Sequence, residues 1–311
     1  MSTFLTTQEA SDLLNVHPNT VLRWIKSGKI QSVRVGKTYR IPAHAIEAFL
    51  DAPRRDSARI IAVANQKGGV AKTTTTVNLA AATAIKGKRV LVVDLDPQAG
   101  CAVSLGIDSS SLHQTIYDVL MLDEVQMRDI LIKTGAGFDL APSNIDLAGA
   151  EVELKQLLAS EQVLKRNLET VTSDYDFIYL DCPPSLGVIT VNALTAAHEL
   201  LIPMATEVMA LRGLEMLLTT TERVRRVLNP RLRILGILVT KYDVRTINSR
   251  EVYDYLAEKS KQAGVHLFNT YIKNSVRFIE APNTKLPLVL YDPNHDGSRA
   301  YLQIAEEVIH D

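Results

Sequence analysis

The apolar and polar positions form two different patterns along the chain. From residue 59 to the end, short runs of β-branched residues alternate with longer segments in which apolar residues recur at helical spacing. This alternation predicts an α/β fold with a largely parallel sheet covered by helices on both faces. The expected strands are residues 60–65, 89–94, 138–141, 177–181, 199–204, 234–240 and 266–271, and the expected helices include 73–85, 187–196, 212–228 and 249–263.

The first 52 residues have a shorter, mixed pattern. Thr6 and Glu9 have capping-box spacing at the start of a short helix, and Pro18 is well placed at the first position of a second helix. Residues 30–41 alternate apolar and polar side chains around a Gly-Lys turn, which predicts a β-hairpin, and a last amphipathic turn follows at 43–50. Helix, turn, helix and hairpin predict a small winged helix-turn-helix domain.

Length and composition agree with two globular domains. The 311 residues exceed the usual length of one domain, and 46% hydrophobic with 22% charged residues is typical of a soluble protein. Residues 1–52 and 59–311 are the expected domains, and residues 53–58 are the expected linker. No apolar run approaches the ~20 residues that span a membrane. Cys101 and Cys182 have no disulfide or metal-site spacing, so a cytoplasmic protein with reduced thiols is expected.

The loop between the first two expected elements of the larger domain carries the clearest chemistry. Lys67-Gly-Gly-Val-Ala-Lys72-Thr-Thr would place backbone N–H groups and a lysine around an anion at a helix N-terminus. The Thr73 hydroxyl suits a Mg²⁺ ion that bridges nucleotide phosphates. A glycine turn that binds nothing is the alternative, and two lysines in the turn argue against it. The candidate nucleotide-binding residues are Lys67, Gly68, Gly69, Val70, Ala71, Lys72, Thr73 and Thr74.

Two expected strands of the larger domain end in acidic residues. Asp94 and Asp96 follow the strand at 89–94, and Asp181 ends the strand at 177–181. Ligands bind at the carboxyl ends of strands in open α/β sheets, and an aspartate there is the usual partner of a nucleotide-bound Mg²⁺. Each aspartate alone could be a helix N-cap. Together with the lysine-rich loop they predict a nucleotide and magnesium site.

These motifs resemble those of one ATPase family. The loop resembles the deviant Walker A motif of the ParA/MinD/Soj ATPases, although Ala71 stands where a glycine precedes the lysine and so needs a φ that a Cβ tolerates. Asp94-Leu-Asp-Pro-Gln resembles the family's A′ box, and Leu180-Asp-Cys-Pro-Pro its Walker B box. The resemblance extends through nearly all of residues 59–311 and implies a P-loop NTPase that uses ATP and Mg²⁺.

The resemblance also implies roles for individual residues. Lys67 would reach into the nucleotide of a partner subunit in an ATP sandwich dimer, and Lys72 would bind the phosphates of its own. Asp96 would orient or deprotonate the attacking water. The Mg²⁺ ligands would be Thr73, Asp94 and Asp181, with Pro183 and Pro184 in a switch that senses the γ-phosphate.

In ParA-type partition ATPases, two arginines grip DNA phosphates without sequence preference, and they fall here on Arg245 and Arg277. A further basic set could widen that surface, or could be a solvated helix face. Lys273 stands where the family usually has an arginine, which keeps the charge but not the geometry. The further basic set is Arg223, Arg225, Arg226, Arg231 and Arg233.

The N-terminal domain resembles MerR/excisionase-type DNA-binding domains. It is basic, with nine Lys/Arg against five Asp/Glu in residues 1–59. The resemblance places its second helix in the major groove and its wing on the backbone or in the minor groove. A small winged domain used for protein contact is the alternative. The implied DNA-facing residues are Asn19, Thr20, Arg23 and Lys26 on the helix and Arg34, Lys37, Tyr39 and Arg40 on the wing, with Val21, Leu22, Trp24 and Ile25 on the inner face.

The expected function is that of an ATP-driven DNA-partition protein. It would form a homodimer with ATP, bind nucleoid DNA non-specifically, release it when a ParB-type partner stimulates hydrolysis, and repress its own operon through the N-terminal domain. The alternative is a transcriptional regulator that uses the nucleotide only as a dimerisation switch. A MinD-like membrane cycle lacks support, because residues 299–311 end acidic and not as a basic amphipathic helix.

Overall fold

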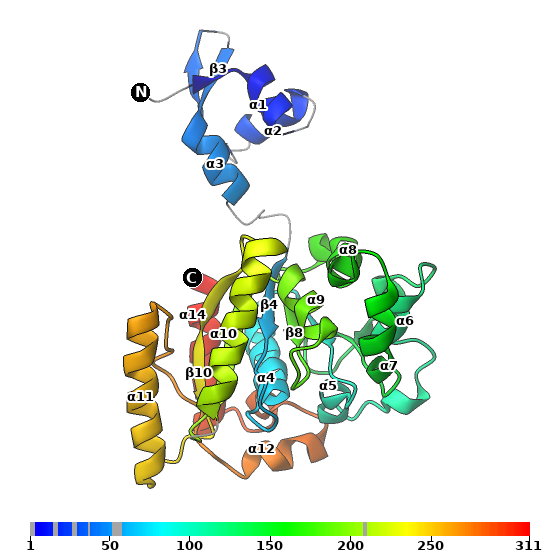
Figure 1. Ribbon diagram of the computed structural model, residues 1–311, viewed down its shortest axis with the longest axis vertical. Coiled ribbons are helices and arrows are strands. Elements are labelled where there is room, and N and C mark those ends of the chain that lie inside the picture. The colour runs from blue at the N-terminus through cyan, green and yellow to red at the C-terminus, as the bar shows by residue number, and fades with distance from the viewer. Residues whose placement is uncertain (1–3, 15–17, 27–29, 37, 52–57, 208–209) are drawn as a thin grey trace. The chain divides into compact units, whose positions relative to one another are not determined.

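A computed structural model describes residues 4–14, 18–26, 30–36, 38–51, 58–207 and 210–311. The chain divides into two compact units, residues 1–57 and residues 58–311 (Figure 1). Each unit has a hydrophobic core of its own. The two units are therefore described separately.

The N-terminal unit is a three-stranded antiparallel sheet with three helices. Thr6 caps the first helix as predicted: its hydroxyl accepts from Glu9 N at 3.1 Å, and the Glu9 carboxylate accepts from Thr6 N at 2.7 Å. Trp24 packs against Phe49 with ring centroids 4.8 Å apart, and Val21 and Ile25 are buried, as expected for the inner face of the second helix. The elements are β1 (Phe4–Leu5), α1 (Thr7–Leu13), α2 (Pro18–Lys26), β2 (Val33–Val35), β3 (Thr38–Pro42) and α3 (Ala43–Asp51), with sheet order β1-β3-β2.

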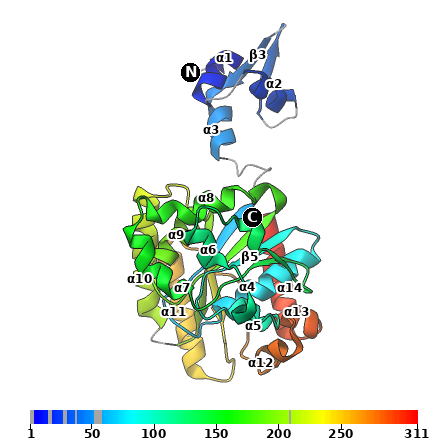
Figure 2. The ribbon, with the colours of Figure 1, turned by 90° about the vertical axis from the view of Figure 1, so that its right-hand side faces the viewer.

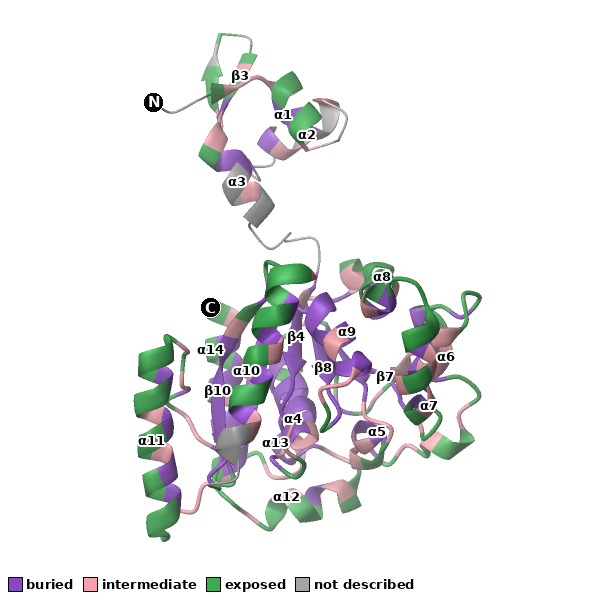
Figure 3. Cartoon of the chain, in the orientation of Figure 1, coloured by how far each residue is buried: buried purple, intermediate pink, exposed green. Residues whose placement is uncertain are grey.

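The larger unit is built on a seven-stranded sheet of order β10-β9-β4-β8-β5-β7-β6, in which only the pair β6 and β7 is antiparallel. The central strands are buried on both faces, which is why their sequences are continuous apolar runs (Figure 3). The strands are β4 (Arg59–Val63), β5 (Val90–Asp94), β6 (Ile132–Lys133), β7 (Asp139–Ala141), β8 (Phe177–Asp181), β9 (Glu199–Ala205) and β10 (Arg233–Thr240).

Six predicted strands are confirmed and the seventh prediction, at 266–271, is wrong. That segment runs beside β10 and forms an isolated bridge there, Ile237 to Leu267, and a second isolated bridge joins Tyr242 to Lys273 just beyond both. Its backbone bonds to β10 are interrupted: Phe268 N donates to Ile237 O at 3.0 Å, and Ile272 N donates to Val239 O at 2.8 Å. Ile237 N also donates to His266 O at 2.8 Å. These separated bonds hold the segment in place without forming a continuous ladder.

Helices cover both faces of the sheet (Figures 1 and 2). One core lies under α8, α9 and α10, and the other lies under α4 and α14. The Thr75 hydroxyl of α4 and the Tyr301 hydroxyl of α14 are hydrogen-bonded at 3.1 Å in the second core. The helices are α4 (Lys72–Ile85), α5 (Gly100–Ser104), α6 (Ile116–Met121), α7 (Leu147–Glu153), α8 (Val163–Glu169), α9 (Val188–Ala196), α10 (Ala210–Val227), α11 (Ile247–Ala263), α12 (Arg277–Glu280), α13 (Leu288–Tyr291) and α14 (Asp296–His310).

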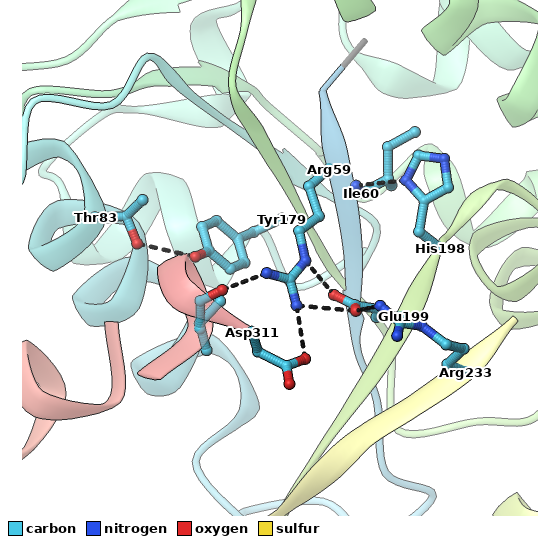
Figure 4. A network of polar contacts seen from close by, with 9 residues as sticks. Arg59, Ile60, Thr83, Tyr179, His198, Glu199, Arg233 and Asp311 are labelled. Atoms are coloured by element: carbon cyan, nitrogen blue, oxygen red, sulfur yellow. Dashed lines mark hydrogen bonds and ion pairs between the residues drawn. The ribbon is translucent and has the colours of Figure 1, made fainter. Parts of the chain in front are cut away.

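A polar network ties the first strand of this unit to its last helix (Figure 4). The Arg59 guanidinium pairs with the Glu199 carboxylate, with Nε and Oε2 2.5 Å apart, and it also donates to Val308 O and to Asp311 Oδ2. Glu199 is only 1% exposed, and Arg233 pairs with its second oxygen at 2.6 Å. The network therefore neutralises a buried carboxylate and joins β4, β9, β10 and the end of α14.

Replacing Arg59 by alanine is expected to lower the free energy of unfolding by about 3 kcal/mol, because it removes one of two cations from a buried carboxylate. The change would be measured by urea unfolding followed by circular dichroism. Arg89→Ala is the matched control, since its ion pair with Asp176 is exposed and a surface pair contributes little. Equal midpoints for the two variants would contradict the role given to Arg59.

Candidate active site

The loop between β4 and α4 turns sharply at two residues with left-handed backbone. Gly69 has φ +73°, and Ala71, which precedes the helix, has φ +67° and ψ +34°. Ala71 therefore adopts the left-handed conformation, which a residue with a Cβ tolerates at a cost of about 1 kcal/mol relative to glycine. Ala71 offers no side-chain cap, so backbone N–H groups in the first turn of α4 lack an intrahelical or capping acceptor. Such a helix start is suited to bind an anion.

Lys72 begins α4 and lies inside the loop. Its side chain is largely buried, and Nζ donates to the backbone oxygen of Lys67 at 3.2 Å. Burial lowers the pKa of Lys72, and the nearby Asp181 carboxylate opposes that shift. The loop therefore holds the Lys72 ammonium group within it. The positive charge of that group lies next to the backbone N–H groups at the start of α4.

Two buried carboxylates lie side by side at the carboxyl end of the sheet. Asp94 and Asp181 are opposite each other in neighbouring strands β5 and β8, and both are 0% exposed. Asp181 accepts from the Thr73 hydroxyl at 2.6 Å and from the Thr76 hydroxyl at 3.0 Å. Asp94 accepts from the backbone N of Asp96 at 3.1 Å. The structure therefore brings together Thr73, Asp94 and Asp181.

Burial raises the pKa of Asp181 to about 6. Burial and the neighbouring Asp181 charge raise the pKa of Asp94 well above its ordinary value. Two carboxylates this close and this dry cannot both be charged without a cation, and a divalent ion would supply it. Carboxylate and hydroxyl oxygens are ligands that Mg²⁺ prefers, so the residues present fit that ion.

Cys101 lies within this group, which the sequence analysis did not anticipate. Its sulfur and one oxygen from each of the two aspartates lie within 4.8 Å of one another. The backbone N of Cys101 donates to Asp94 Oδ2 at 3.0 Å, and its Sγ lies 3.5 Å from Asp181 Oδ2. Burial raises the pKa of the thiol, so it stays protonated at neutral pH and donates to the carboxylate. A protonated thiol orients the aspartates and is not itself a ligand for Mg²⁺.

Asp96 lies at the rim of this group. It is half-buried, two residues beyond Asp94, and its carboxylate accepts from Gln98 N at 3.0 Å. Its negative charge acts on the Lys72 ammonium group. A half-buried carboxylate at the edge of the group formed by Thr73, Asp94 and Asp181, and acting on the Lys72 ammonium group, is placed to contact a water molecule.

Lys67 makes its side-chain and backbone contacts within its own chain. Its ammonium group forms an ion pair with Glu207, which holds the pKa of that carboxyl below its usual range. Its backbone N donates to Asn65 Oδ1 at 3.0 Å, and Asn65 Nδ2 donates to Pro203 O at 2.8 Å. Glu207, just after β9, was missed from the sequence. In the sequence, the one feature that distinguishes Glu207 is that it is the first acidic residue after a predicted apolar strand.

The predicted DNA-contacting arginines of the larger unit are exposed and paired. Arg245 is 84% exposed and pairs with Asp243 at 2.8 Å, and Arg277 begins α12 and pairs with Glu280 at 2.9 Å. Lys273 pairs with Asp296 at 3.0 Å. Both arginines therefore carry carboxylate partners that a phosphate would have to replace.

In the N-terminal unit, Arg34 and Arg40 are exposed on the hairpin, on the register pairs Arg34–Tyr39 and Val33–Arg40. Tyr39, also predicted on the wing, is partly buried and packs against the core of this unit. The remaining predicted DNA-contacting side chains lie outside the described residues. They are Asn19, Thr20, Arg23 and Lys26, whose backbone belongs to α2, and Lys37. Among the helices that the structure describes, none is long and apolar enough to cross a membrane.

The sequence matches models of two known domains. An AAA domain model matches residues 58–234, and a helix-turn-helix domain model matches residues 4–54. The chain is 45% identical over 251 residues to the sporulation initiation inhibitor protein Soj of Bacillus subtilis, which covers 80% of this chain and 98% of that protein. It is 44% identical over 254 residues to the chromosome partitioning protein ParA of Caulobacter vibrioides, covering 81% and 94%.

Solved structures agree with these matches. A cobyrinic acid a,c-diamide synthase from Mycobacterium smegmatis with bound ADP and magnesium is 40% identical, with a TM-score of 0.72 over 81% of this chain and 94% of that one. The cell division ATPase MinD of Pyrococcus furiosus is 28% identical, with a TM-score of 0.64 over 81% and 99%. The fold and the site thus define a P-loop ATPase that uses ATP and Mg²⁺. The chain belongs to the ParA/Soj family of partition ATPases.

Proposed function

We propose that this ATPase dimerises with ATP, binds DNA without sequence preference as the dimer, and leaves DNA when a ParB-type partner stimulates hydrolysis. The observation that carries the proposal is the convergence of Lys72 and Thr73 at a helix start with the buried pair Asp94 and Asp181. Relatives with the names Soj and ParA support the partition role. Figure 1 shows the strand ends and the start of α4 at the same end of the unit.

The residues of the site have separate tasks in this proposal. The start of α4 and Lys72 bind the phosphates, and Thr73, Asp94 and Asp181 hold Mg²⁺, with Asp181 acting through water. When bound, Mg²⁺ neutralises charge on the phosphate oxygens. Asp96 orients the attacking water or accepts its proton.

Lys67 is proposed to act on the nucleotide of the partner subunit. Cationic charge beside a departing phosphoryl group stabilises the transition state. Within one chain the Lys67 ammonium group is paired with Glu207. Lys67 would therefore leave Glu207 when a second subunit brings a phosphate within its reach.

Non-specific DNA binding is assigned to Arg245 and Arg277. Each is exposed, belongs to the larger unit and is paired with a carboxylate other than Asp94 and Asp181. Phosphate contacts position a protein on DNA but carry no sequence information. DNA binding through these residues should therefore be equal for DNA of any sequence.

Arg245→Glu and Arg277→Glu are each expected to weaken ATP-dependent binding to random DNA and to flatten its salt dependence by about one unit of slope per lost phosphate contact. Dimerisation with ATP should be unchanged. Fluorescence anisotropy at several salt concentrations measures both quantities. Arg89→Glu is the control, since Arg89 is exposed just before β5, at the opposite end of the strands. If both variants keep the native affinity and slope, the DNA surface lies elsewhere, and residues 223–233 are the next candidate.

The helix-turn-helix match also favours a second candidate function, a transcriptional regulator that uses ATP only to dimerise. We propose instead that the N-terminal unit adds operator binding to a partition ATPase. The two functions differ in one property of the larger unit. Only a partition ATPase needs ATP-dependent, sequence-independent DNA binding by residues 58–311 alone.

Removing residues 1–57 is expected to abolish binding to the specific site upstream of the gene while leaving ATP-dependent binding to random DNA. The truncated chain keeps both cores of the larger unit, and the Soj relative aligns over 98% of its length while covering 80% of this chain. DNase footprinting on the upstream region is the measurement. An unchanged footprint from the truncated protein would refute this division of labour.

A further inference from the structure

A cavity lies at the end of the larger sheet that is opposite to the nucleotide site. Its lining includes Val90, which begins β5, Asp139, which begins β7, and Tyr175, which lies two residues before β8. Asp94 and Asp181 end β5 and β8, so the two sites are separated by the length of these strands. The cavity measures about 670 Å³, which is within the range of small-molecule sites in proteins. It is called the amino-end cavity.

Two cations of the amino-end cavity are available to a ligand. Lys88 lines it and forms no ion pair within the described part of the chain. Arg128 pairs with Asp174 at 2.7 Å, but the Arg128 side chain is 53% exposed. An ion pair at the surface contributes little, so Arg128 can turn to a ligand at little cost.

Arg89 also lines the amino-end cavity, but its guanidinium group is held by the protein. Nη2 pairs with Asp176 Oδ1 at 2.8 Å, Nε donates to Asp176 Oδ2 at 3.3 Å, and Nη1 donates to Ser173 O at 3.3 Å. These bonds occupy three of the nitrogens that a ligand would need. Arg89 therefore belongs to the frame of the cavity, and the positive charge open to a ligand is that of Lys88 and Arg128.

Asp139 gives the amino-end cavity a buried acceptor. Its side chain is only 9% exposed, and its Oδ2 accepts from the Tyr175 hydroxyl at 2.6 Å and from Lys133 Nζ at 2.6 Å. Among the hydrogen bonds made by the described side chains, none goes to Asp139 Oδ1. Each carboxylate oxygen can accept two hydrogen bonds, so Oδ1 is open to a hydroxyl or amine of a molecule in the cavity.

The wall next to Asp139 is a tight turn with fixed geometry. The Thr134 hydroxyl donates to Phe138 O at 2.5 Å, and Ala136 N donates to Thr134 Oγ1 at 3.2 Å. Gly137 has φ +84°, a conformation that glycine adopts without a steric cost. A site that is already held in shape loses little conformational freedom when a ligand binds.

These features select the class of ligand. A phosphate group accepts several charge-assisted hydrogen bonds at once, which suits Lys88 and Arg128. Asp139 Oδ1 needs a donor elsewhere on the same molecule. The backbone of a nucleic acid is disfavoured, because Asp139 and Asp174 line the same cavity and would repel a continuous row of phosphates.

We propose that the amino-end cavity binds a small phosphate monoester that carries hydroxyl groups. Its phosphate lies at Lys88 and Arg128, and one hydroxyl donates to Asp139 Oδ1. Sugar phosphates and nucleoside monophosphates share this chemistry. The site is separate from the nucleotide site, and it does not depend on DNA binding or on partition.

The test is isothermal titration of the full chain with ribose 5-phosphate, in the presence of saturating ADP and Mg²⁺ so that the nucleotide site is filled. One molecule should bind per chain with a Kd below about 1 mM. Lys88→Ala should weaken binding at least about tenfold, because it removes a charge-assisted contact to phosphate. Lys86→Ala is the matched control, since Lys86 is exposed, pairs with Glu306 at 3.2 Å and does not line the cavity. The control should bind as the native chain does.

Titrations with inorganic phosphate and AMP complete the test. Inorganic phosphate should bind about tenfold more weakly than ribose 5-phosphate, because it has no sugar hydroxyl to donate to Asp139. Asp139→Asn should reduce this difference, because an amide oxygen is a weaker acceptor than a carboxylate, and urea unfolding would show that this variant is folded. AMP that binds more tightly than ribose 5-phosphate would identify a nucleoside monophosphate as the ligand, whereas AMP that binds equally or more weakly would identify a sugar phosphate.

Four results would overturn the proposal. They are no binding of either ester to the native chain, equal binding of inorganic phosphate and ribose 5-phosphate, equal losses in Lys88→Ala and Lys86→Ala, and displacement of ribose 5-phosphate by random-sequence DNA. The last result would show that this end of the sheet is a nucleic-acid surface.

Discussion

Lys72→Ala is expected to abolish ATP binding, with a loss of affinity of at least about a hundredfold, because charge-assisted contacts to phosphate are among the strongest that a side chain makes. Lys72 is buried within its loop, with Nζ donating to Lys67 O at 3.2 Å. A phosphate oxygen that takes the place of this carbonyl oxygen would be attracted by the full positive charge of the Lys72 ammonium group. Isothermal titration with ATP and Mg²⁺ measures the affinity.

Lys67→Ala is the matched control for Lys72→Ala. Both lysines belong to one loop, but the Lys67 ammonium group points to Glu207 and not into the loop. The Lys67 variant should therefore bind ATP with nearly native affinity and fail only in steps that need a second subunit. Tight ATP binding by Lys72→Ala, or equal losses in the two variants, would refute the assignment of Lys72.

Asp96→Ala is expected to bind ATP, to lose hydrolysis by about 10²- to 10⁴-fold, and so to accumulate as a dimer. ATP binding and ATP hydrolysis are expected to separate in this variant, because Asp96 lies at the rim of the proposed Mg²⁺ site, whereas Asp94 and Asp181 are buried within it. Removing a rim carboxylate leaves the phosphate and metal contacts in place. Single-turnover hydrolysis and light scattering with ATP measure the two effects.

Asp96→Asn keeps the local turn, because an amide oxygen can still accept from Gln98 N as the carboxylate does at 3.0 Å. The Asp96→Asn variant should lose ATP hydrolysis as completely as Asp96→Ala does if the negative charge of Asp96 is what activates the water. A variant that remains monomeric with ATP while hydrolysis persists would show that Asp96 has another role.

The sequence was sufficient to predict the sheet core and the parts of the site that lie on short local motifs. The strands β5 and β8 are apolar runs ending in aspartate, so their carboxyl ends and their acidic residues could be located together. The capping box at Thr6 is equally local, and it is confirmed. Where the bounds of a helix or strand depend on contacts with other elements, the predicted and observed bounds differ by one or two residues. The helix α10 (Ala210–Val227), for example, was expected at 212–228.

What the sequence did not predict depends on contacts between distant residues. Lys67 and Glu207 are 140 positions apart, so no local pattern links them. Cys101, the second residue of α5, joins the aspartates through the hydrogen bond that its backbone N donates to Asp94 at 3.0 Å. The strand β6 has two residues, which are too few for a periodic pattern, and it forms because it pairs with the edge of β7. The left-handed φ of Ala71 is imposed by the loop against the residue's own preference.

The most direct test of the central claim is DNA binding by residues 58–311 in the presence of ATP, of ADP and of no nucleotide, with random-sequence DNA and with light scattering on the same samples. The proposal predicts a dimer and tight DNA binding with ATP only, equal for unrelated DNA sequences and weakened by salt. A chain that stays monomeric with ATP, or that binds DNA equally in all three states, would contradict it.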